Sequence, residues 1–292
     1  MRVHLVDGTW ELFRAHYSKR PPHSAPDGRD VKATAGLLMS LLGLLEDPRE
    51  SVTHIAVAFD NPIRSFRNDL FPDYKTDEAV PPELRDQFDL AEEATRALGV
   101  TVWSMKDFEA DDGLAAGAAR YIQAVEQVRI MACDKDLMQC VRGRQVVLVD
   151  RMRDREMDED YVRAQKGIAP RSIPDWLALV GDTADGLPGL PGFGEKGAAA
   201  VLAVFEHIEG IPDEPARWPK TIRGGDRLCQ TLRNRREDAL LYRTLATLRT
   251  DAPVTEDLAA LAYRGARRDE WNAFCDRLGH ADLRARRVRE MR

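Results

Sequence analysis

Acidic residues dominate the positions at which this sequence could do chemistry. Three tight clusters stand out, at 109–112 (Glu-Ala-Asp-Asp), 134–136 (Asp-Lys-Asp) and 182–185 (Asp-Thr-Ala-Asp), and Asp7 and Asp60 each end a short apolar run. Carboxylates packed together repel one another unless cations neutralise them. Oxygen ligands without a Cys or His set select Mg²⁺ or Mn²⁺, and two such ions about 3.5–4 Å apart support in-line phosphoryl displacement. The pattern indicates metal-dependent phosphodiester hydrolysis.

Each cluster also has an ordinary structural interpretation. The acids at 109–112 begin an Ala-rich segment, where a helix dipole favours negative charge. Asp182 and Asp185 are suited to a cap and a turn before a glycine, and the acids at 134–136 to a loop after a strand. These interpretations do not explain why the clusters should converge.

The apolar runs predict the framework that would bring the acids together. They alternate with helix-length segments, which is typical of a parallel α/β sheet whose strands are buried on both faces. The ligand crevice of such a sheet lies beyond the carboxyl ends of its strands. We therefore expect the aspartates that follow the runs to lie at one edge of the sheet, together with the helix that begins near residue 109. The predicted strands are 3–6, 55–59, 101–103, 128–133 and 146–149, and the predicted helices between them include 32–47 and 82–98.

The character of the chain changes after a charged stretch at 151–160. Strand-like runs then give way to helical patterns and turn residues. We predict two domains, 1–168 as the α/β core and 169–292 as a helical region. Within the second, a Gly/Pro-rich hairpin at 186–197 separates two predicted helices at 173–180 and 198–205.

Composition limits the functional classes. The chain has 292 residues, of which 43% are hydrophobic and 32% charged, and it contains no apolar run long enough to span a bilayer. Its four cysteines show no zinc-type spacing, which favours reduced thiols in a cytoplasm. The net charge of −6 argues at first against a nucleic-acid partner. However, 217–249 carries nine basic residues against three acidic ones, and the tail adds Arg284, Arg286, Arg287, Arg289 and Arg292.

Taken in order, these motifs make the sequence similar to the 5′ nuclease (flap endonuclease) family, and specifically to the 5′→3′ exonuclease region of bacterial DNA polymerase I. The similarity runs from Val3 to about Val254. The resemblance implies a PIN-like, Rossmann-like parallel sheet flanked by helices. It also implies a helical arch at about 61–90 and a helix-three-turn-helix (helix-hairpin-helix) at about 173–206.

The resemblance further implies a complete set of metal-site carboxylates. By analogy, one ion would be held by Asp7, Asp60, Glu109 and Asp111, and the other by Asp134, Asp136, Asp182 and Asp185, with Asp112 shared or in an outer position. Asp150 also ends a strand-like run but has no counterpart in the family site, so we interpret it as a turn residue. Without these nine carboxylates the chain has 43 basic and 40 acidic residues, so the rest of the chain carries a net positive charge.

A second set of residues resembles the family's substrate-handling segment. Arg67 and Lys75 would contact the scissile phosphate, and Tyr74 would stack on an unpaired base; ordinary surface or half-buried roles are the alternatives. Arg14 also matches a family position near the first aspartate, and we predict that it contacts DNA. The family usually continues Tyr-Lys with an arginine three positions on, where this chain has Glu78 preceded by Asp77.

The hairpin spells G-x-G-x-x-G at 192–197. A dinucleotide-binding fingerprint requires a strand before this motif, whereas here a Pro-rich turn follows a helix. We interpret it instead as a phosphate-backbone grip made by Gly189, Gly192, Gly194 and Lys196. A K⁺ ion often joins this contact in the family. The glycines at 186 and 197, where relatives carry Asn and Thr, argue against K⁺ here.

The leading hypothesis is a 5′ nuclease that depends on two divalent ions, Mg²⁺ or Mn²⁺, and cuts DNA with 5′ flaps, nicks or overhangs, including RNA-DNA primers. The resemblance implies a monomer in the bacterial cytoplasm, associated with the nucleoid. Two alternatives stay open, a structure-specific DNA-binding protein with weak catalysis and a PIN-like ribonuclease. Retention of every carboxylate argues against the first, and the hairpin and arch argue against the second.

Overall fold

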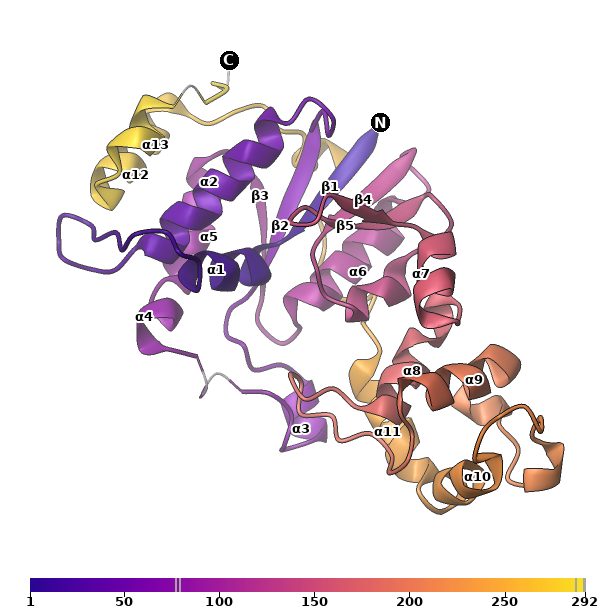
Figure 1. Ribbon diagram of the computed structural model, residues 1–292. Helices are drawn as coiled ribbons and strands as arrows, with labels where there is room; N and C mark the ends of the chain where they lie inside the picture. The colour runs from indigo at the N-terminus through magenta and orange to yellow at the C-terminus, as the bar shows by residue number, and fades with distance from the viewer. Residues whose placement is uncertain (77, 79, 287, 291–292) are drawn as a thin grey trace. The chain divides into compact units, whose positions relative to one another are not determined.

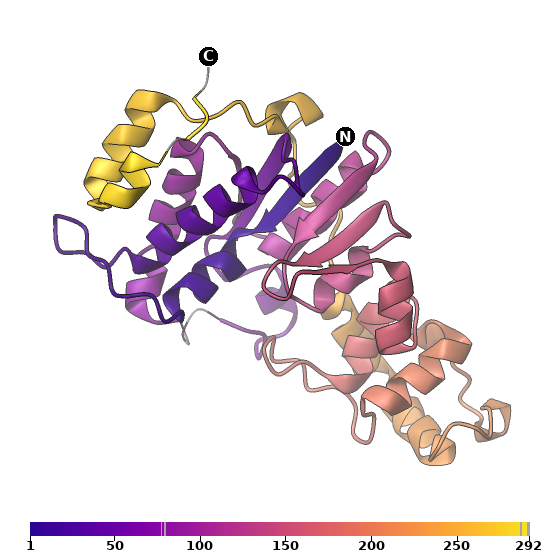
Figure 2. The ribbon, with the colours of Figure 1, turned by 45° about the horizontal axis from the view of Figure 1, so that its top comes forward.

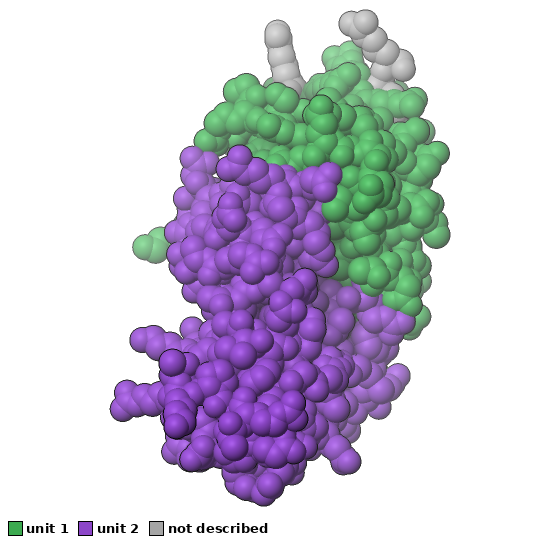
Figure 3. All heavy atoms as spheres, turned by 90° about the vertical axis from the view of Figure 1, so that its right-hand side faces the viewer, with its two compact units in different colours: residues 1–65, 76–132, 250–292 green, residues 66–75, 133–249 purple. Residues whose placement is uncertain are grey.

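The structure is a computed structural model that describes residues 1–292 except 77, 79, 287 and 291–292. The chain forms two compact units, coloured separately in Figure 3. Unit 1 comprises residues 1–65, 76–132 and 250–292, and unit 2 comprises 66–75 and 133–249.

Unit 1 is built on four parallel strands in the order β3-β2-β1-β4. In β1, β2 and β4 the apolar side chains of the strand interiors are buried, as expected for a sheet covered on both faces, whereas Val102 of the edge strand β3 is half-buried. Its elements are β1 (Arg2–Asp7), α1 (Gly8–His16), α2 (Lys32–Glu46), β2 (His54–Asp60), α4 (Pro82–Arg85), α5 (Phe88–Ala97), β3 (Thr101–Met105), α6 (Ala110–Tyr121), β4 (Gln127–Met131), the 3-10 helix η6 (Leu258–Leu261), α12 (Arg268–Leu278) and α13 (Ala281–Ala285).

The strand order places a topological switch point at β1. The chain moves from β1 to β2 and then to β3 in one direction, and returns past β1 to form β4. With right-handed crossovers, this reversal puts α6 on the opposite face from α1 and α2 (Figure 1). Ligands of such sheets bind beyond the carboxyl ends of the strands at the switch point, which is where Asp7 ends β1. No helix within the described part of the chain is long and apolar enough to cross a membrane.

Unit 2 combines an antiparallel strand pair with short helices. The pair joins β5 to β6, with Leu148 opposite Met157, and α8 packs against both α9 and α11 (Figure 2). The elements of unit 2 are α3 (Arg67–Leu70), the 3-10 helix η2 (Asp136–Cys140), β5 (Val146–Asp150), β6 (Arg155–Met157), α7 (Glu159–Lys166), η3 (Pro170–Ser172), α8 (Ile173–Val180), α9 (Glu195–Phe205), η4 (Ile208–Gly210), η5 (Pro215–Arg217), α10 (Gly225–Asn234) and α11 (Arg236–Ala246).

The compact units do not coincide with the division at residue 168 predicted from the sequence. The last 43 residues, from 250 onward, belong to unit 1 because they return to its sheet. There, Trp103 Nε1 donates to Glu256 at 3.1 Å, and the backbone N–H of Tyr263 donates to the carbonyl of Thr53 at 2.8 Å. The composition of this segment resembles that of the helical region before it, so sequence pattern alone does not reveal the return.

A buried charge network joins the amino-terminal halves of β1 and β4. His4 is fully buried and its Nε2 lies 3.0 Å from Glu50, while Arg129 donates to both oxygens of that carboxylate at 2.7 and 3.0 Å. Burial opposes ionisation of Glu50, but the hydrogen bonds from His4 and Arg129 outweigh it and lower its pKa from 4.5 to about 2. The carboxylate therefore stabilises the fold in its ionised form.

Replacing Glu50 with Gln should lower the free energy of unfolding at neutral pH by about 3 kcal/mol, because Arg129 loses its charged partner. A folded-state pKa below the unfolded one gives stabilisation that is complete above about pH 4.5 and is lost as the pH falls toward 2. The difference between wild type and variant in urea unfolding should therefore shrink as the pH falls from about 5 to 3. A difference that does not change with pH would contradict this role. Glu93→Gln, at an exposed ion pair with Arg277, is the control and should cost less than about 1 kcal/mol.

Candidate metal centre

The predicted acids of unit 1 lie at the carboxyl ends of its strands. Asp7 ends β1 and its Oδ1 accepts a hydrogen bond from the backbone N–H of Trp10 at 2.8 Å, which caps α1. Asp60 ends β2 and its Oδ1 accepts from the N–H of Ala110, the first residue of α6, at 2.6 Å. The register between β1 and β2 aligns these two strand ends at the same edge. The structure thus places these aspartates where the sequence predicted.

The 109–112 motif forms a capping box at the start of α6. The side chain of Glu109 accepts from the N–H of Asp112, and Asp112 in turn accepts from the N–H of Glu109 at 2.9 Å. Ser65 Oγ also donates to Glu109 Oε1 at 2.9 Å. The helix-start interpretation is therefore confirmed for these two residues, and Asp112, which is fully buried, fixes the helix terminus. Asp111 is half-buried at the same terminus.

Three predicted ligands meet in unit 2. Asp136, Asp182 and Asp185 each offer a carboxylate oxygen, and these oxygens all lie within 4.8 Å of one another. Asp136 and Asp182 are 6% and 7% exposed. Asp134 Oδ1 accepts from the N–H of Asp136 at 2.8 Å, a turn that begins η2. The convergence that the ordinary interpretations did not explain is present here.

Electrostatic repulsion sets the state of this cluster. Burial, followed by the negative charges of Asp134, Asp185 and Asp182, raises the pKa of Asp136 well above its usual value. Asp136 Oδ1 is buried and has no hydrogen-bond partner among the described residues. A buried carboxylate oxygen without a donor costs free energy, and a divalent cation is the group that would satisfy it. The all-oxygen set fits Mg²⁺ or Mn²⁺.

Two lysines partly neutralise the cluster. Lys75 Nζ lies 2.9 Å from Asp185 Oδ1, and its backbone N–H donates to the carbonyl of Asp185 at 3.1 Å. Lys135 Nζ donates to Asp182 Oδ2. Burial lowers the pKa of Lys135, but the hydrogen bond to Asp182 and the nearby carboxylates outweigh burial and raise it. Sequence reasoning identified Lys75 but assigned no role to Lys135. The position of Lys135 between Asp134 and Asp136 could have indicated that it pairs with a carboxylate of the site.

Comparisons with known proteins identify the family of the chain. Two models of one family match adjacent parts of the chain: the N-terminal resolvase-like domain of 5′-3′ exonucleases at residues 2–167, and their C-terminal SAM fold at residues 168–269. The chain belongs to the 5′-3′ exonuclease family. It is 34% identical to DNA polymerase I of Bacillus caldotenax over 279 residues and 31% identical to that of Bacillus subtilis over 283. These alignments cover 94% and 96% of the chain but 31% of each relative, so the chain spans about a third of the polymerases it matches.

Solved structures show the same fold. T5 5′-exonuclease with bound divalent metal ions (zinc) superposes with a TM-score of 0.68 and 18% identity, covering 98% of this chain and 96% of that one. The catalytic core of Rad2 in complex with DNA substrate gives a TM-score of 0.61 and 14% identity, covering 97% and 90%. At these identities the likeness concerns the fold, which is the mixed α/β fold with a mainly parallel sheet and a helical SAM-like region expected from the family resemblance.

Two roles assigned from the resemblance are corrected by the structure. Arg67 is 1% exposed and its guanidinium donates to the carbonyls of Leu245 and Thr247 at 2.7 and 3.2 Å, so it ties α3 to the end of α11 instead of facing a phosphate. Tyr74 is 3% exposed and does not present its ring for base stacking. Family position alone did not reveal that both side chains are packed inside unit 2.

The predicted arch contains little continuous helix. Within 61–90 the structure describes α3 and α4, of four residues each, and the start of α5. Asp77, one of the two acids that depart from the family pattern, lies outside the described residues, and so do Arg287 and Arg292 of the basic tail.

Arg14 is held by Glu11, a buried carboxylate on its own helix, and by Ser40 Oγ at 2.9 Å. The DNA contact expected of Arg14 stays a prediction. Asp150 accepts from the N–H groups of Met152 and Arg153 at 3.0 and 3.1 Å, which confirms that it is a turn residue.

The hairpin divides into a buried part and an exposed part. The helix α8 has the predicted bounds, and α9 begins at Glu195, one turn before its predicted start, after a turn and not a strand. Gly189 is buried, and a Cβ there would lie 2.5 Å from the carbonyl carbon of Val180, so it serves close packing and the contact with DNA assigned to it is corrected. Gly192, Gly194 and Lys196 are exposed and stay predicted DNA contacts.

Gly186 fixes the loop that carries Lys75. It has φ +75°, and a Cβ at this position would lie 2.3 Å from the carbonyl oxygen of Asp73. Only glycine permits both the backbone conformation and the approach. The 66–75 segment therefore lies against the metal-ligand loop at Gly186.

Gly186→Ala should lower the free energy of unfolding by about 1–3 kcal/mol, because the new Cβ meets backbone in a left-handed conformation. It should also weaken Mn²⁺ binding, since Asp185 lies beside the displaced loop. Urea unfolding and calorimetric titration would measure the two effects. The matched control is Gly197→Ala in α9, where a Cβ meets Leu228 at an ordinary 3.6 Å, and this variant should be neutral or slightly stabilised. Equal behaviour of the two variants would contradict the assigned role.

Proposed function

We propose that this chain is a structure-specific 5′ nuclease that hydrolyses phosphodiester bonds in branched or nicked DNA with two divalent ions. The observation that carries the proposal is the buried cluster of Asp136, Asp182 and Asp185, which has an oxygen without a donor and excess negative charge. Membership of the 5′-3′ exonuclease family supports cleavage that starts from the 5′ end of a strand. The DNA complex of the Rad2 core supports a DNA substrate.

The predicted ligands form two sets, one in each compact unit. Asp134, Asp136, Asp182 and Asp185 would hold one ion, and Asp7, Asp60, Glu109 and Asp111 the other. When bound, such ions activate water and stabilise the attacking and leaving oxygens of the phosphate. Asp112 and Ser65 would orient Glu109 through the hydrogen bonds already present. Products would be a 5′-phosphate and a 3′-hydroxyl.

Lys75 would contact the phosphate, as the family resemblance implies. Its ammonium group pairs with Asp185 and 28% of its side chain is exposed, so it would lie within reach of a phosphate bound at the cluster. Lys135 would remain a positioning residue for Asp182.

Duplex DNA would be gripped by backbone through the exposed part of the hairpin. Gly194 has open space where a Cβ would stand, so a phosphate can approach the first N–H groups of α9, with Lys196 beside them. Arg227 of α10, which lies next to Gly192, would add a second cation. This mode of binding carries no sequence preference. The natural role would be removal of RNA primers and flaps during replication and repair, by a monomer at the nucleoid.

The proposal is tested with a 5′-labelled flap duplex and the matching RNA flap, in Mg²⁺, Mn²⁺ or EDTA. The wild-type protein should cut the DNA flap only with a divalent ion, and Asp182→Asn should cut at least about 100-fold more slowly while still binding DNA. Binding without cleavage in any metal would favour the DNA-binding alternative. Cleavage of single-stranded RNA with no use of duplex junctions would favour the ribonuclease.

Lys75→Ala should reduce turnover by about 10- to 100-fold and change DNA affinity less than about threefold, because the lysine acts at the reacting phosphate. Single-turnover cleavage and fluorescence anisotropy separate the two effects. Lys106→Ala, at an exposed lysine that follows β3, is the matched control. Unchanged turnover for Lys75→Ala would remove this residue from the mechanism.

A further inference from the structure

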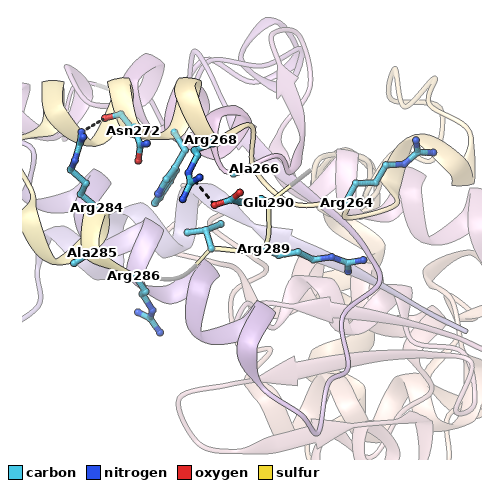
Figure 4. Close-up of a pocket in the computed structure, with 11 residues that line it drawn as sticks. Arg264, Ala266, Arg268, Asn272, Arg284, Ala285, Arg286, Arg289 and Glu290 are labelled. Carbon is cyan, nitrogen blue, oxygen red and sulfur yellow. Dashed lines mark hydrogen bonds and ion pairs between the residues drawn. The ribbon is translucent and has the colours of Figure 1, made fainter. Parts of the chain in front are cut away.

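A basic cavity of about 1000 Å³ lies in the C-terminal segment of unit 1. It is formed by α12, α13 and the segments just before and after them, as Figure 4 shows. Among the described residues, one acidic residue, Glu290, lines it together with five arginines. These are Arg264, Arg268, Arg284, Arg286 and Arg289.

The positive charge of this cavity is only partly neutralised. Arg268 pairs with Glu290 at 3.2 Å, Arg284 with Asp276, and Arg286 with Glu46. The side chains of Arg264 and Arg289 are exposed, and no carboxylate among the described residues pairs with either. In Figure 4 they extend on the far side of the cavity from Arg284. The cavity therefore holds surplus cationic groups.

A second observation points to a ligand. Trp271 lines the cavity and is 4% exposed, and its Nε1 is buried with no hydrogen-bond acceptor among the described residues. A buried indole N–H nearly always has an acceptor. The guanidinium groups would attract an anionic oxygen, which is such an acceptor, to the wall that Trp271 lines.

The cavity lies at the amino-terminal edge of the unit 1 sheet. Ala262 forms a bridge with His54, the first residue of β2, and the N–H of Ala266 donates to the carbonyl of Arg289 at 2.8 Å. Asp60 stands at the other end of β2, which is about 20 Å long at seven residues. A ligand here cannot be the phosphate that is cut.

We propose that this cavity binds the phosphodiester backbone of nucleic acid, as a contact separate from the metal centre and the hairpin. Arginine pairs with phosphate through two parallel hydrogen bonds, and it is weakly hydrated, which makes it suited to this task. The guanidinium groups are spread around the cavity, so they would meet successive phosphates of a polymer and not one small anion (Figure 4). Most of the cavity lies beyond residue 269, where the family match ends.

The test compares two double variants that remove the same charge from the same segment. Arg264→Gln with Arg289→Gln removes the unpaired cations of the cavity, whereas Arg267→Gln with Arg277→Gln removes exposed arginines that do not line it. Binding of a long DNA duplex is followed by anisotropy in EDTA at several salt concentrations. The cavity variant should bind about 5- to 20-fold more weakly, and its slope of log affinity against log salt should fall by about 1–2, while the control matches wild type.

Because binding is measured without divalent ions, the result does not depend on whether the protein cuts DNA. Cleavage of a flap with short duplex arms should be equal for wild type and the cavity variant. Equal DNA affinity of the cavity and control variants would overturn the proposal.

Trp271 provides an independent measurement. DNA should change the part of the tryptophan fluorescence that is lost in Trp271→Phe, whereas inorganic pyrophosphate and poly-glutamate should leave it unchanged. A response to pyrophosphate at lower concentration than to DNA would make the ligand a free polyphosphate. A response to poly-glutamate alone would make it an acidic protein. Either result overturns the proposal.

Discussion

Repulsion between buried carboxylates is the constraint on which the site in unit 2 depends. Asp136, Asp182 and Asp185 are held within 4.8 Å of one another in surroundings that raise the pKa of Asp136. A fold that forces like charges together loses stability unless something neutralises them. Lys75 and Lys135 supply part of the neutralisation through their ion pairs, and the remaining Asp136 oxygen has no donor among the residues described. A divalent cation would supply the remaining positive charge. The proposed catalysis and the charge balance of the cluster therefore both require a bound metal ion.

The surrounding elements maintain this arrangement by close backbone contacts. Gly186 and Gly189 adopt positive φ and approach neighbouring backbone too closely for a Cβ. These contacts hold the 182–185 loop against the segment that carries Lys75 and against the end of α8. In unit 1, the capping box of Glu109 and Asp112 plays the same part for α6. Backbone N–H groups also donate to six of the predicted ligands, namely Asp7, Asp60, Glu109, Asp112, Asp134 and Asp182.

The sequence predicted the elements whose signal is local. Strand ends at Asp7 and Asp60 and the bounds of α8 follow from short apolar runs and from turn residues, and the structure confirms them. The helix predicted at 82–98 is divided into α4 and α5, and between them the buried Gln87 accepts from the N–H and hydroxyl of Thr34 at the start of α2, a contact distant in sequence.

Long-range packing was beyond the reach of pattern analysis. Motif position placed Arg67 and Tyr74 at the substrate, although the segment that carries them packs inward. The return of 250–292 to the sheet of unit 1, and the cavity that it forms there, likewise depend on contacts between residues distant in sequence. The overall charge of −6 was also uninformative, because it averages an acidic cluster in unit 2 with a basic cavity in unit 1.

The most direct test of the central claim is a count of bound Mn²⁺ by electron paramagnetic resonance, in wild type and in the double variant Asp182→Asn with Asp185→Asn. The account predicts that the wild-type protein binds two Mn²⁺ ions and that the variant, still folded by circular dichroism, binds one. A variant that binds as many ions as wild type, with the same affinities, would contradict the claim that the unit 2 carboxylates form a divalent-metal site.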